Sequence, residues 1–297
     1  YYSGCGDYGD ILIMPMVGTP DKLDKEGEKT QEMPYCSKFS HENEVAEPGY
    51  YSVMLEKHSI LTELTATQRA AIYRFSFPET DSATILLDMD YSLSVFGDQR
   101  NDVLDLQVVG DNAICGSKQT KGWAWEQAIN FYAEASQPFT YTIINDTVQR
   151  EGVDKPRMKA LLNFKAEKNT PIYFKIALSG VDTEGAKKNL LAEIPEFDFD
   201  AVRKATHKEW NKVLGRVDVE TTNETDKAIF YTAMYHSMIA PMLFSDINGD
   251  YRGADDKVHN SPAPRYTCFS LWDTYRAKQP LMTIIQPEKA GEFVATM

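Results

Sequence analysis

The segment with the most suggestive chemistry is residues 269–276, which read FSLWDTYR. Trp272 can stack on the apolar face of a sugar ring while Asp273 accepts hydrogen bonds from neighbouring hydroxyls. Arg276 follows Asp273 by three residues, so on a helix both share one face and the guanidinium can orient the carboxylate. The alternative is purely structural: a helix-capping Asp, a buried Trp and an ordinary ion pair.

A glycine-rich opening is the second candidate for ligand contact. Residues 3–10 read SGCGDYGD and include Gly4, Cys5 and Asp7. Glycine lets a backbone turn sharply and approach a ligand closely. The segment lacks a lysine and its carboxylates would repel phosphate, so it does not read as a phosphate-binding loop. A structural turn and a ligand-contacting loop both remain open.

No metal site follows from spacing. Residues 245–250 begin like a calcium-binding loop, yet Tyr251 stands where glycine is needed and Lys257 where glutamate is needed. A tight turn at Asn248-Gly249, between Leu243-Phe244 and Tyr251, fits this stretch better. The cysteines form no CxxC pair, which argues against zinc and leaves room for one or two disulfides. They are Cys5, Cys36, Cys115 and Cys268.

Composition excludes some partners. Thirty-one basic against 44 acidic residues give a net charge of −13, which repels nucleic acid and anionic lipid and favours a neutral ligand such as a sugar. No apolar run reaches the roughly 18 residues needed to span a bilayer, so no membrane-spanning segment is predicted.

Residues 1–180 carry strand patterns. Short apolar and β-branched runs recur about every ten residues between turn residues, which predicts a β-sandwich. Residues 21–47 are charged and weakly patterned and are expected to form a long surface loop. The predicted strands are residues 11–17, 50–55, 60–65, 72–77, 84–89, 103–109, 113–117, 128–133, 141–144, 158–164 and 172–178.

From about residue 181 the apolar period becomes helical. Helices over 184–193 and 199–213 form a predicted linker, residues 181–218. Residues 219–297 are expected to begin a helical toroid or bundle. Its first helix opens with a capping box at Thr221 and Glu224, and two more cover 269–282 and 288–297. The expected buried stripe of the first helix is Ile229, Phe230, Ala233, Met234 and Met238.

Four segments together resemble glycoside hydrolase family 92: GCGDYGD at 4–10, GYYSV at 49–53, ELTAT at 63–67 and FSLWDTYR at 269–276. The resemblance implies a β-sandwich, a helical linker and an (α/α)6 catalytic barrel. It also implies a calcium-dependent, inverting exo-α-mannosidase that acts on mannose-containing oligosaccharides or glycoproteins. Members are commonly secreted or periplasmic bacterial enzymes.

The resemblance also implies site residues. Trp272 and Asp273 would wall the subsite for the terminal mannose, with Arg276 behind them. The loop holding Gly4, Cys5 and Asp7 would reach the same cleft from the β-domain. The catalytic acid and base and the calcium ligands are expected beyond Met297. Because the chain begins with Tyr1 and stops within a predicted helix, we expect a fragment that cannot complete a catalytic cycle alone.

Two other functions share these features. A glycoside phosphorylase joins a β-sandwich to the same kind of barrel and would need phosphate. A non-catalytic carbohydrate-binding protein would use the aromatic β-domain alone, and it leaves residues 269–276 without a role.

Overall fold

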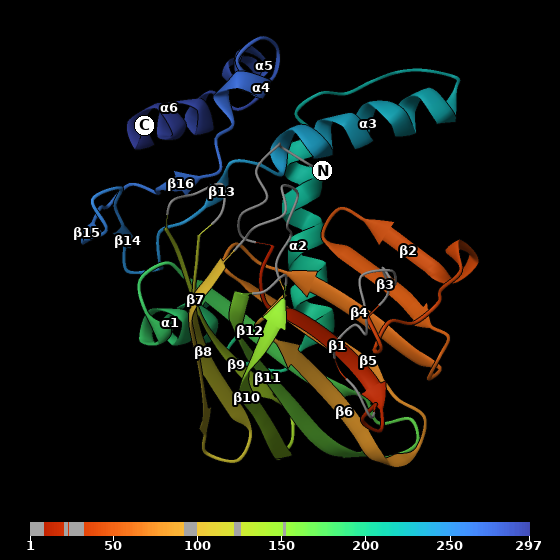
Figure 1. The fold of residues 1–297 in the computed structure, drawn as a ribbon. Coiled ribbons are helices and arrows are strands. Elements are labelled where there is room, and N and C mark those ends of the chain that lie inside the picture. The colour runs from red at the N-terminus through yellow and green to blue at the C-terminus, as the bar shows by residue number, and fades with distance from the viewer. Residues whose placement is uncertain (1–8, 21–22, 24–32, 92–99, 122–125, 151–152) are drawn as a thin grey trace.

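The fold is a two-sheet sandwich followed by helices, as Figure 1 shows for the computed structural model, which describes residues 9–20, 23, 33–91, 100–121, 126–150 and 153–297. The smaller sheet has the order β1-β6-β11-β10: β1 Leu12–Val17, β6 Thr80–Asp88, β10 Thr140–Arg150 and β11 Val153–Ala166. The larger has the order β2-β3-β4-β5-β12-β9-β8-β7: β2 Glu44–Glu47, β3 Tyr50–Leu55, β4 Ile60–Ala66, β5 Ala70–Ser76, β7 Arg100–Val109, β8 Ala113–Lys121, β9 Gln127–Ala135 and β12 Ile172–Ser179.

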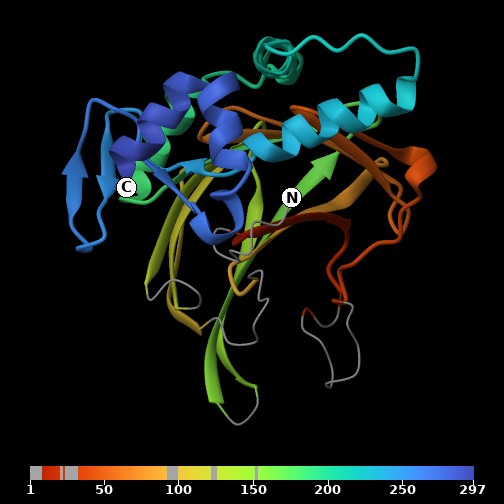
Figure 2. The ribbon, with the colours of Figure 1, turned by 90° about the horizontal axis from the view of Figure 1, so that it is seen from above.

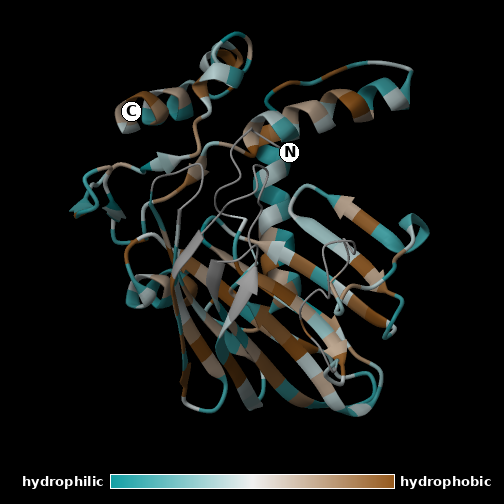
Figure 3. Ribbon diagram, in the orientation of Figure 1, coloured by the Kyte–Doolittle hydropathy of each residue, from teal (hydrophilic) through white to brown (hydrophobic). Residues whose placement is uncertain are grey.

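The core lies between the two sheets. Alternate side chains of each strand point inward, so Phe75, Phe131 and Phe174 of the larger sheet meet Ile85 and Leu162 of the smaller, all fully buried. Apolar residues run along these strands in Figure 3. Each run predicted as a strand coincides with one in the structure, which confirms the predicted β-rich first part.

The surface-loop prediction for residues 21–47 is wrong at its end. A short 3-10 helix, His41–Asn43, leads into β2, which pairs antiparallel with β3 in the register Glu44↔Val53. The pattern of β2 is weak because it is an edge strand whose side chains are mostly exposed.

The same segment also covers the outside of the smaller sheet. Leu23 and Tyr35 are buried there against Leu86 and Leu161. The Tyr35 hydroxyl donates to Asp88 at 2.8 Å. This cover removes the large aliphatic side chains on the outer face of the smaller sheet from contact with water, which stabilises the fold.

Two helices lie on the outer face of the larger sheet, where the sequence predicted helices: α1 (Thr183–Glu193) and α2 (Phe199–Leu214). Each begins at an aspartate whose carboxylate accepts a backbone N–H of the first turn, Asp182 from Gly185 and Asp198 from Ala201. Buried Leu190 of α1 packs against that face of the sheet.

The chain then forms α3 (Glu224–Met238), α4 (Leu271–Thr274), α5 (Lys278–Ile285) and α6 (Pro287–Thr296), together with two small sheets: β13 (Met242–Leu243) with β16 (Tyr266–Thr267), and β14 (Asp250–Arg252) with β15 (Val258–Asn260). Figure 2 shows these helices from above. Their shared core is Leu214, Met234, Met282, Ile285 and Phe293.

Predictions for α3 were partly wrong. Asn223, and not Thr221, caps the helix: its side chain accepts the N–H groups of Thr225 and Asp226. Of the predicted buried stripe only Met234 is buried, and Ile229 is 62% exposed. Phe230 and Met238 are partly buried against the same core as Met234, so α3 packs along only part of the predicted stripe.

The predicted turn at Asn248-Gly249 is present, since Gly249 has φ +88° and its N–H donates to the Asp246 carbonyl. The strands beside it do not pair with each other, however. Leu243 pairs with Tyr266, and Tyr251 pairs with His259. The sequence of the turn predicts the turn itself, but the strands that pair with β13 and β14 lie further along the chain.

Two features bear on the composition. Cys36 and Cys115 are free thiols, one exposed and one buried. In the part of the chain that the structure describes, no helix combines the length and apolarity required to cross a bilayer.

Candidate functional site

Residues 269–276, which include α4, form an exposed surface segment that we call the shelf. Trp272 lies on α4 and is 88% exposed, and Asp273 and Arg276 are exposed as well. In this chain Trp272 is therefore not part of a hydrophobic core. An indole so open to solvent is available to stack on a ligand.

Asp273 is oriented by its own turn. Its carboxylate accepts a hydrogen bond from the Ser270 hydroxyl, and its backbone N–H donates to the Ser270 carbonyl at 3.1 Å. Ser270 occupies the N-cap of α4 with φ +38°, and Cys268 has φ +61°. Left-handed backbone at two non-glycine residues so close together costs energy, and such conformations gather at functional sites.

Arg276 does not share a helical face with Asp273. The predicted helix over 269–282 breaks into α4 and α5, with residues 275–277 in a turn between them. Pro280 explains the break, because its ring would clash with the carbonyl of Arg276 in a continuous helix and it has no N–H to donate. Pro280 is instead the third residue of α5, where a missing N–H costs nothing.

Aromatic packing holds the shelf from below. The Phe269 and Tyr266 rings contact the Phe293 ring of α6 edge to face, with centroids 6.0 and 4.9 Å apart. The Tyr266 hydroxyl donates to Glu292 at 2.5 Å. The Thr274 hydroxyl donates to the Ser270 carbonyl at 3.0 Å. Trp272 and Asp273 thus project from an ordered base.

Gly4, Cys5 and Asp7 lie outside the described residues. Asp10, which follows them in the sequence, is described: it is almost fully buried, with Lys118 Nζ 2.8 Å from its carboxylate and Gln127 Nε2 donating to it at 2.7 Å. The ion pair connects Asp10 to β8, and the hydrogen bond connects it to β9.

The resemblance does not place its calcium ligands among the described residues, so the calcium site stays a prediction. Nowhere among them do three His, Cys, Asp or Glu side chains come close enough to hold a metal ion. Asp246, which opens the loop-like segment, is instead hydrogen-bonded to Ser179 and Asn189. No catalytic step is derived through calcium from these residues.

Two family models match this chain in succession. Residues 2–179 match the glycosyl hydrolase family 92 N-terminal domain, and residues 185–297 match the family 92 catalytic domain. The chain belongs to glycosyl hydrolase family 92.

Solved family 92 structures share the fold. An α-mannosidase of Bacteroides thetaiotaomicron superposes with a TM-score of 0.86 at 31% identity, and the match covers 97% of this chain and 40% of that one. The same enzyme has been solved in complex with mannoimidazole. A family 92 inverting mannosidase of that organism gives a TM-score of 0.78 at 26% identity, covering 96% of this chain and 38% of its own.

A curated fungal relative agrees at the level of class. An uncharacterized secreted glycosidase of Arthroderma benhamiae is 27% identical over 305 residues, which cover 90% of this chain and 36% of that protein. This family 92 chain therefore spans about two fifths of the length of the relatives it matches.

Two segments that carried the family resemblance turn out to attach α2 to the larger sheet. The Glu63 carboxylate accepts from Arg74 Nε and Nη2, both at 2.6 Å, and from the Tyr50 hydroxyl at 2.8 Å. The Arg203 guanidinium of α2 lies 3.4 Å from the centre of the Tyr50 ring. The sequence did not predict these contacts, because Glu63 pairs with Arg74 across neighbouring strands and Arg203 lies far away in sequence.

Gly49 lies close to α2, which gives a first prediction. It has φ +88°, and a Cβ there would lie 2.6 Å from Thr206 Cγ2 and 3.0 Å from the Trp210 ring. We expect Gly49→Ala to lower the free energy of unfolding by about 3 kcal/mol, from left-handed backbone strain plus overpacking. Urea denaturation of this chain measures the loss.

Gly110 supplies the matched control, because it has φ +68° and open space around its Cβ position. Gly110→Ala should cost only the backbone term, about 1 kcal/mol. Equal losses for the two variants would show that the contact with α2 is not what requires glycine at position 49.

Proposed function

We propose that this chain belongs to an exo-acting α-mannosidase that removes terminal α-linked mannose from mannosides or N-glycans by inverting, calcium-assisted hydrolysis. The observation that carries the proposal is the exposed Trp272 and the oriented Asp273 on a shelf of a family 92 chain whose solved relatives are titled α-mannosidases. An indole and a fixed carboxylate, side by side, suit the apolar face and the hydroxyls of one sugar ring.

The proposed roles divide between the two parts. Trp272 and Asp273 wall the subsite for the terminal mannose, with Arg276 as an outer contact. The loop with Gly4, Cys5 and Asp7 closes the same cleft from the β-domain. These roles need only binding and orientation, which interactions of this kind supply when the reacting groups come from elsewhere.

Inverting hydrolysis needs a carboxylic acid to protonate the leaving oxygen and a carboxylate to activate water, roughly 6.5–9.5 Å apart. We propose that this pair and the calcium ligands come from the remainder of the family fold, an (α/α)6 barrel that α3 to α6 begin. Support comes from the coverage, since the chain spans 40% of the α-mannosidase it matches. Secretion or periplasmic export is proposed from the fungal relative, which is described as secreted.

The test is mannose release from α-1,2-mannobiose by this chain and by its complete reading frame, each with calcium and with EDTA. Release by the complete protein only, abolished by EDTA, is the expected result. Turnover by the 297-residue chain would overturn the assignment of acid and base to the remainder. A phosphate-dependent product would identify a phosphorylase, and sugar binding by residues 1–180 without turnover of any α-mannoside would identify a binding protein.

A further inference from the structure

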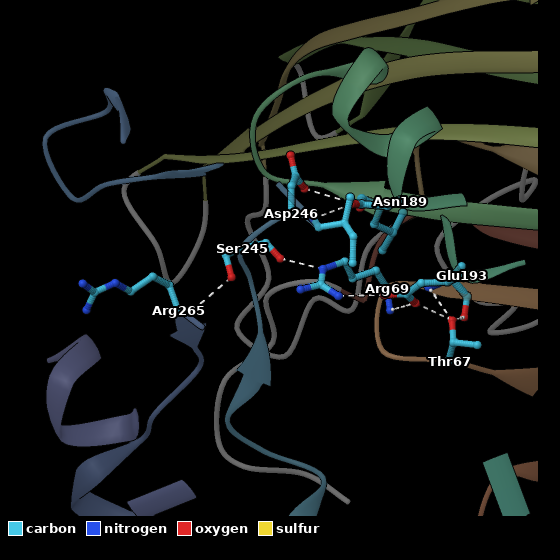
Figure 4. A network of polar contacts seen from close by, with 10 residues as sticks. Thr67, Arg69, Asn189, Glu193, Ser245, Asp246 and Arg265 are labelled. Carbon is cyan, nitrogen blue, oxygen red and sulfur yellow. Dashed lines mark hydrogen bonds and ion pairs between the residues drawn. The ribbon is translucent and has the colours of Figure 1, made fainter. Parts of the chain in front are cut away.

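The segment between β13 and β14 is attached to the β-domain side through the buried carboxylate of Asp246. Asp246 is 3% exposed. Its Oδ2 accepts from the Ser179 hydroxyl at 2.7 Å, at the end of β12, and its Oδ1 accepts from Asn189 Nδ2 of α1 at 2.8 Å. Figure 4 shows Asp246 turned toward Asn189. Both carboxylate oxygens are therefore held by elements of the β-domain side.

Asn189 contacts the same segment with both polar atoms of its side-chain amide. It is fully buried, and its Nδ2 also donates to the Leu178 carbonyl at 2.9 Å. Its Oδ1 accepts the backbone N–H of Ile247 at 2.8 Å. The space is tight, because a Cβ on Gly185 would lie 2.4 Å from Asp246 Oδ2. Directional bonds to a carboxylate and to the adjacent backbone fix the segment in one register.

A second set of contacts secures the segment one residue earlier. Arg69 Nε donates to the Ser245 carbonyl at 2.8 Å, while its Nη1 pairs with Glu193 of α1 at 2.7 Å. Thr67 also donates to the Glu193 carboxylate, at 2.6 Å. Figure 4 shows this chain of contacts running from Thr67 to Ser245. The turn between β4 and β5 is thereby joined to the segment.

From there the connection runs to the shelf. Arg265 donates its backbone N–H to the Ser245 hydroxyl at 3.1 Å. Leu243 pairs with Tyr266, whose ring lies on α6 beneath the shelf. The Phe293 ring that Tyr266 contacts also contacts Phe269, three residues before Trp272. The described contacts thus form an unbroken path from β12 and α1 to the residues that carry the proposed sugar contacts.

We propose that Asp246 and Asn189 are positioning residues, which set where Trp272 and Asp273 stand relative to the β-domain and so shape the sugar subsite. The part of this proposal that concerns sugar rests on the proposed function; the part that concerns position does not. A buried, hydrogen-bonded carboxylate is a poor source of stability, but it specifies geometry. Burial raises the pKa of Asp246, although the bonds from Ser179 and Asn189 lower it.

The first experiment measures backbone amide exchange by mass spectrometry on this chain, comparing wild type with Asp246→Asn and Asn189→Ala. We expect amides in residues 242–247 and 265–276 to exchange about tenfold faster in both variants, while those of β9 stay at the wild-type rate. Asp256→Asn is the control, because Asp256 is a solvent-exposed aspartate in the neighbouring hairpin, paired with Arg252. It should change neither region.

Two outcomes overturn the proposal: wild-type exchange at 265–276 in both variants, or acceleration that extends equally to β9, which would make the network a general stabiliser. The second experiment uses the complete reading frame. Asp246→Asn should raise KM for α-1,2-mannobiose about fivefold and change kcat less, whereas an unchanged KM contradicts positioning of the subsite. If the wild-type protein releases no mannose, the proposed function fails and the exchange result still decides the positioning role.

Discussion

Asp273→Ala in the complete reading frame is expected to lower kcat/KM for α-mannoside hydrolysis by about 10²-fold, because two hydrogen bonds to a charged acceptor contribute roughly 3 kcal/mol. Trp272→Ala should lower it roughly tenfold, the contribution of one stacked aromatic contact. Both losses should appear mainly in KM if the shelf binds the terminal mannose before and during reaction alike. Initial rates over a range of mannobiose concentrations measure them.

The shelf gives this prediction clean controls. Asp273→Asn keeps the shape and removes the charge, so it should fall between wild type and alanine. Ser270→Ala removes the hydroxyl that hydrogen-bonds Asp273 and should reproduce part of the loss. The side chains of Ser270, Trp272 and Asp273 lie outside the hydrophobic cores of this chain, so the melting temperatures of these variants should barely change. Wild-type kcat/KM in both Asp273→Ala and Trp272→Ala would place the substrate elsewhere on the protein.

Glu63→Ala is expected to lower the free energy of unfolding of this chain by about 3 kcal/mol, because Arg74 loses its less exposed partner and keeps only Asp200. Glu63 is 8% exposed at its side chain, and it neutralises Arg74, whose side chain is 19% exposed. Loss of Glu63 also removes the acceptor of the hydrogen bond from the Tyr50 hydroxyl, which lies beneath α2. Urea denaturation followed by circular dichroism measures the change.

Asp200→Ala is the matched control, because Asp200 also pairs with Arg74, at 3.0 Å, but is 75% exposed. An exposed partner of this kind contributes less than about 1 kcal/mol. Similar losses for the two variants would contradict the view that burial gives the Glu63–Arg74 pair its importance.

The same pair makes stability sensitive to acid. Burial alone would raise the pKa of Glu63, but hydrogen bonds from Arg74 and Tyr50 outweigh it and hold the pKa below its usual value. A carboxyl whose folded pKa is lowered contributes stability above its unfolded pKa and loses it as pH falls through the folded pKa. Glu63→Gln should therefore flatten the decline in stability below about pH 5. A decline as steep as in wild type would assign acid sensitivity to other carboxylates.

Local sequence determined the elements and the type of chemistry. The run at residues 50–55 ends at a turn signal at residues 57–59, and this pattern predicted β3, which begins at residue 50 and ends at residue 55. Helices α1 and α2 follow from three- and four-residue spacing and from the aspartates that cap them. Residue type makes Trp272 and Asp273 candidates for sugar contact, since an indole beside a carboxylate suits a sugar ring, and the family resemblance gives them their predicted roles.

Tertiary structure decided what each element faces. Propensity and periodicity act over a few residues, whereas burial depends on which distant surface packs opposite. Asp246 resembled a calcium ligand in sequence, yet Asn189, 57 residues away, makes it a buried anchor. Of the stripe predicted for α3, Met234 is buried, Phe230 and Met238 are partly buried against the same core, and Ile229 is exposed. The exposure of Trp272 on α4 is likewise a feature of the tertiary structure, because residue type alone was also compatible with a buried indole.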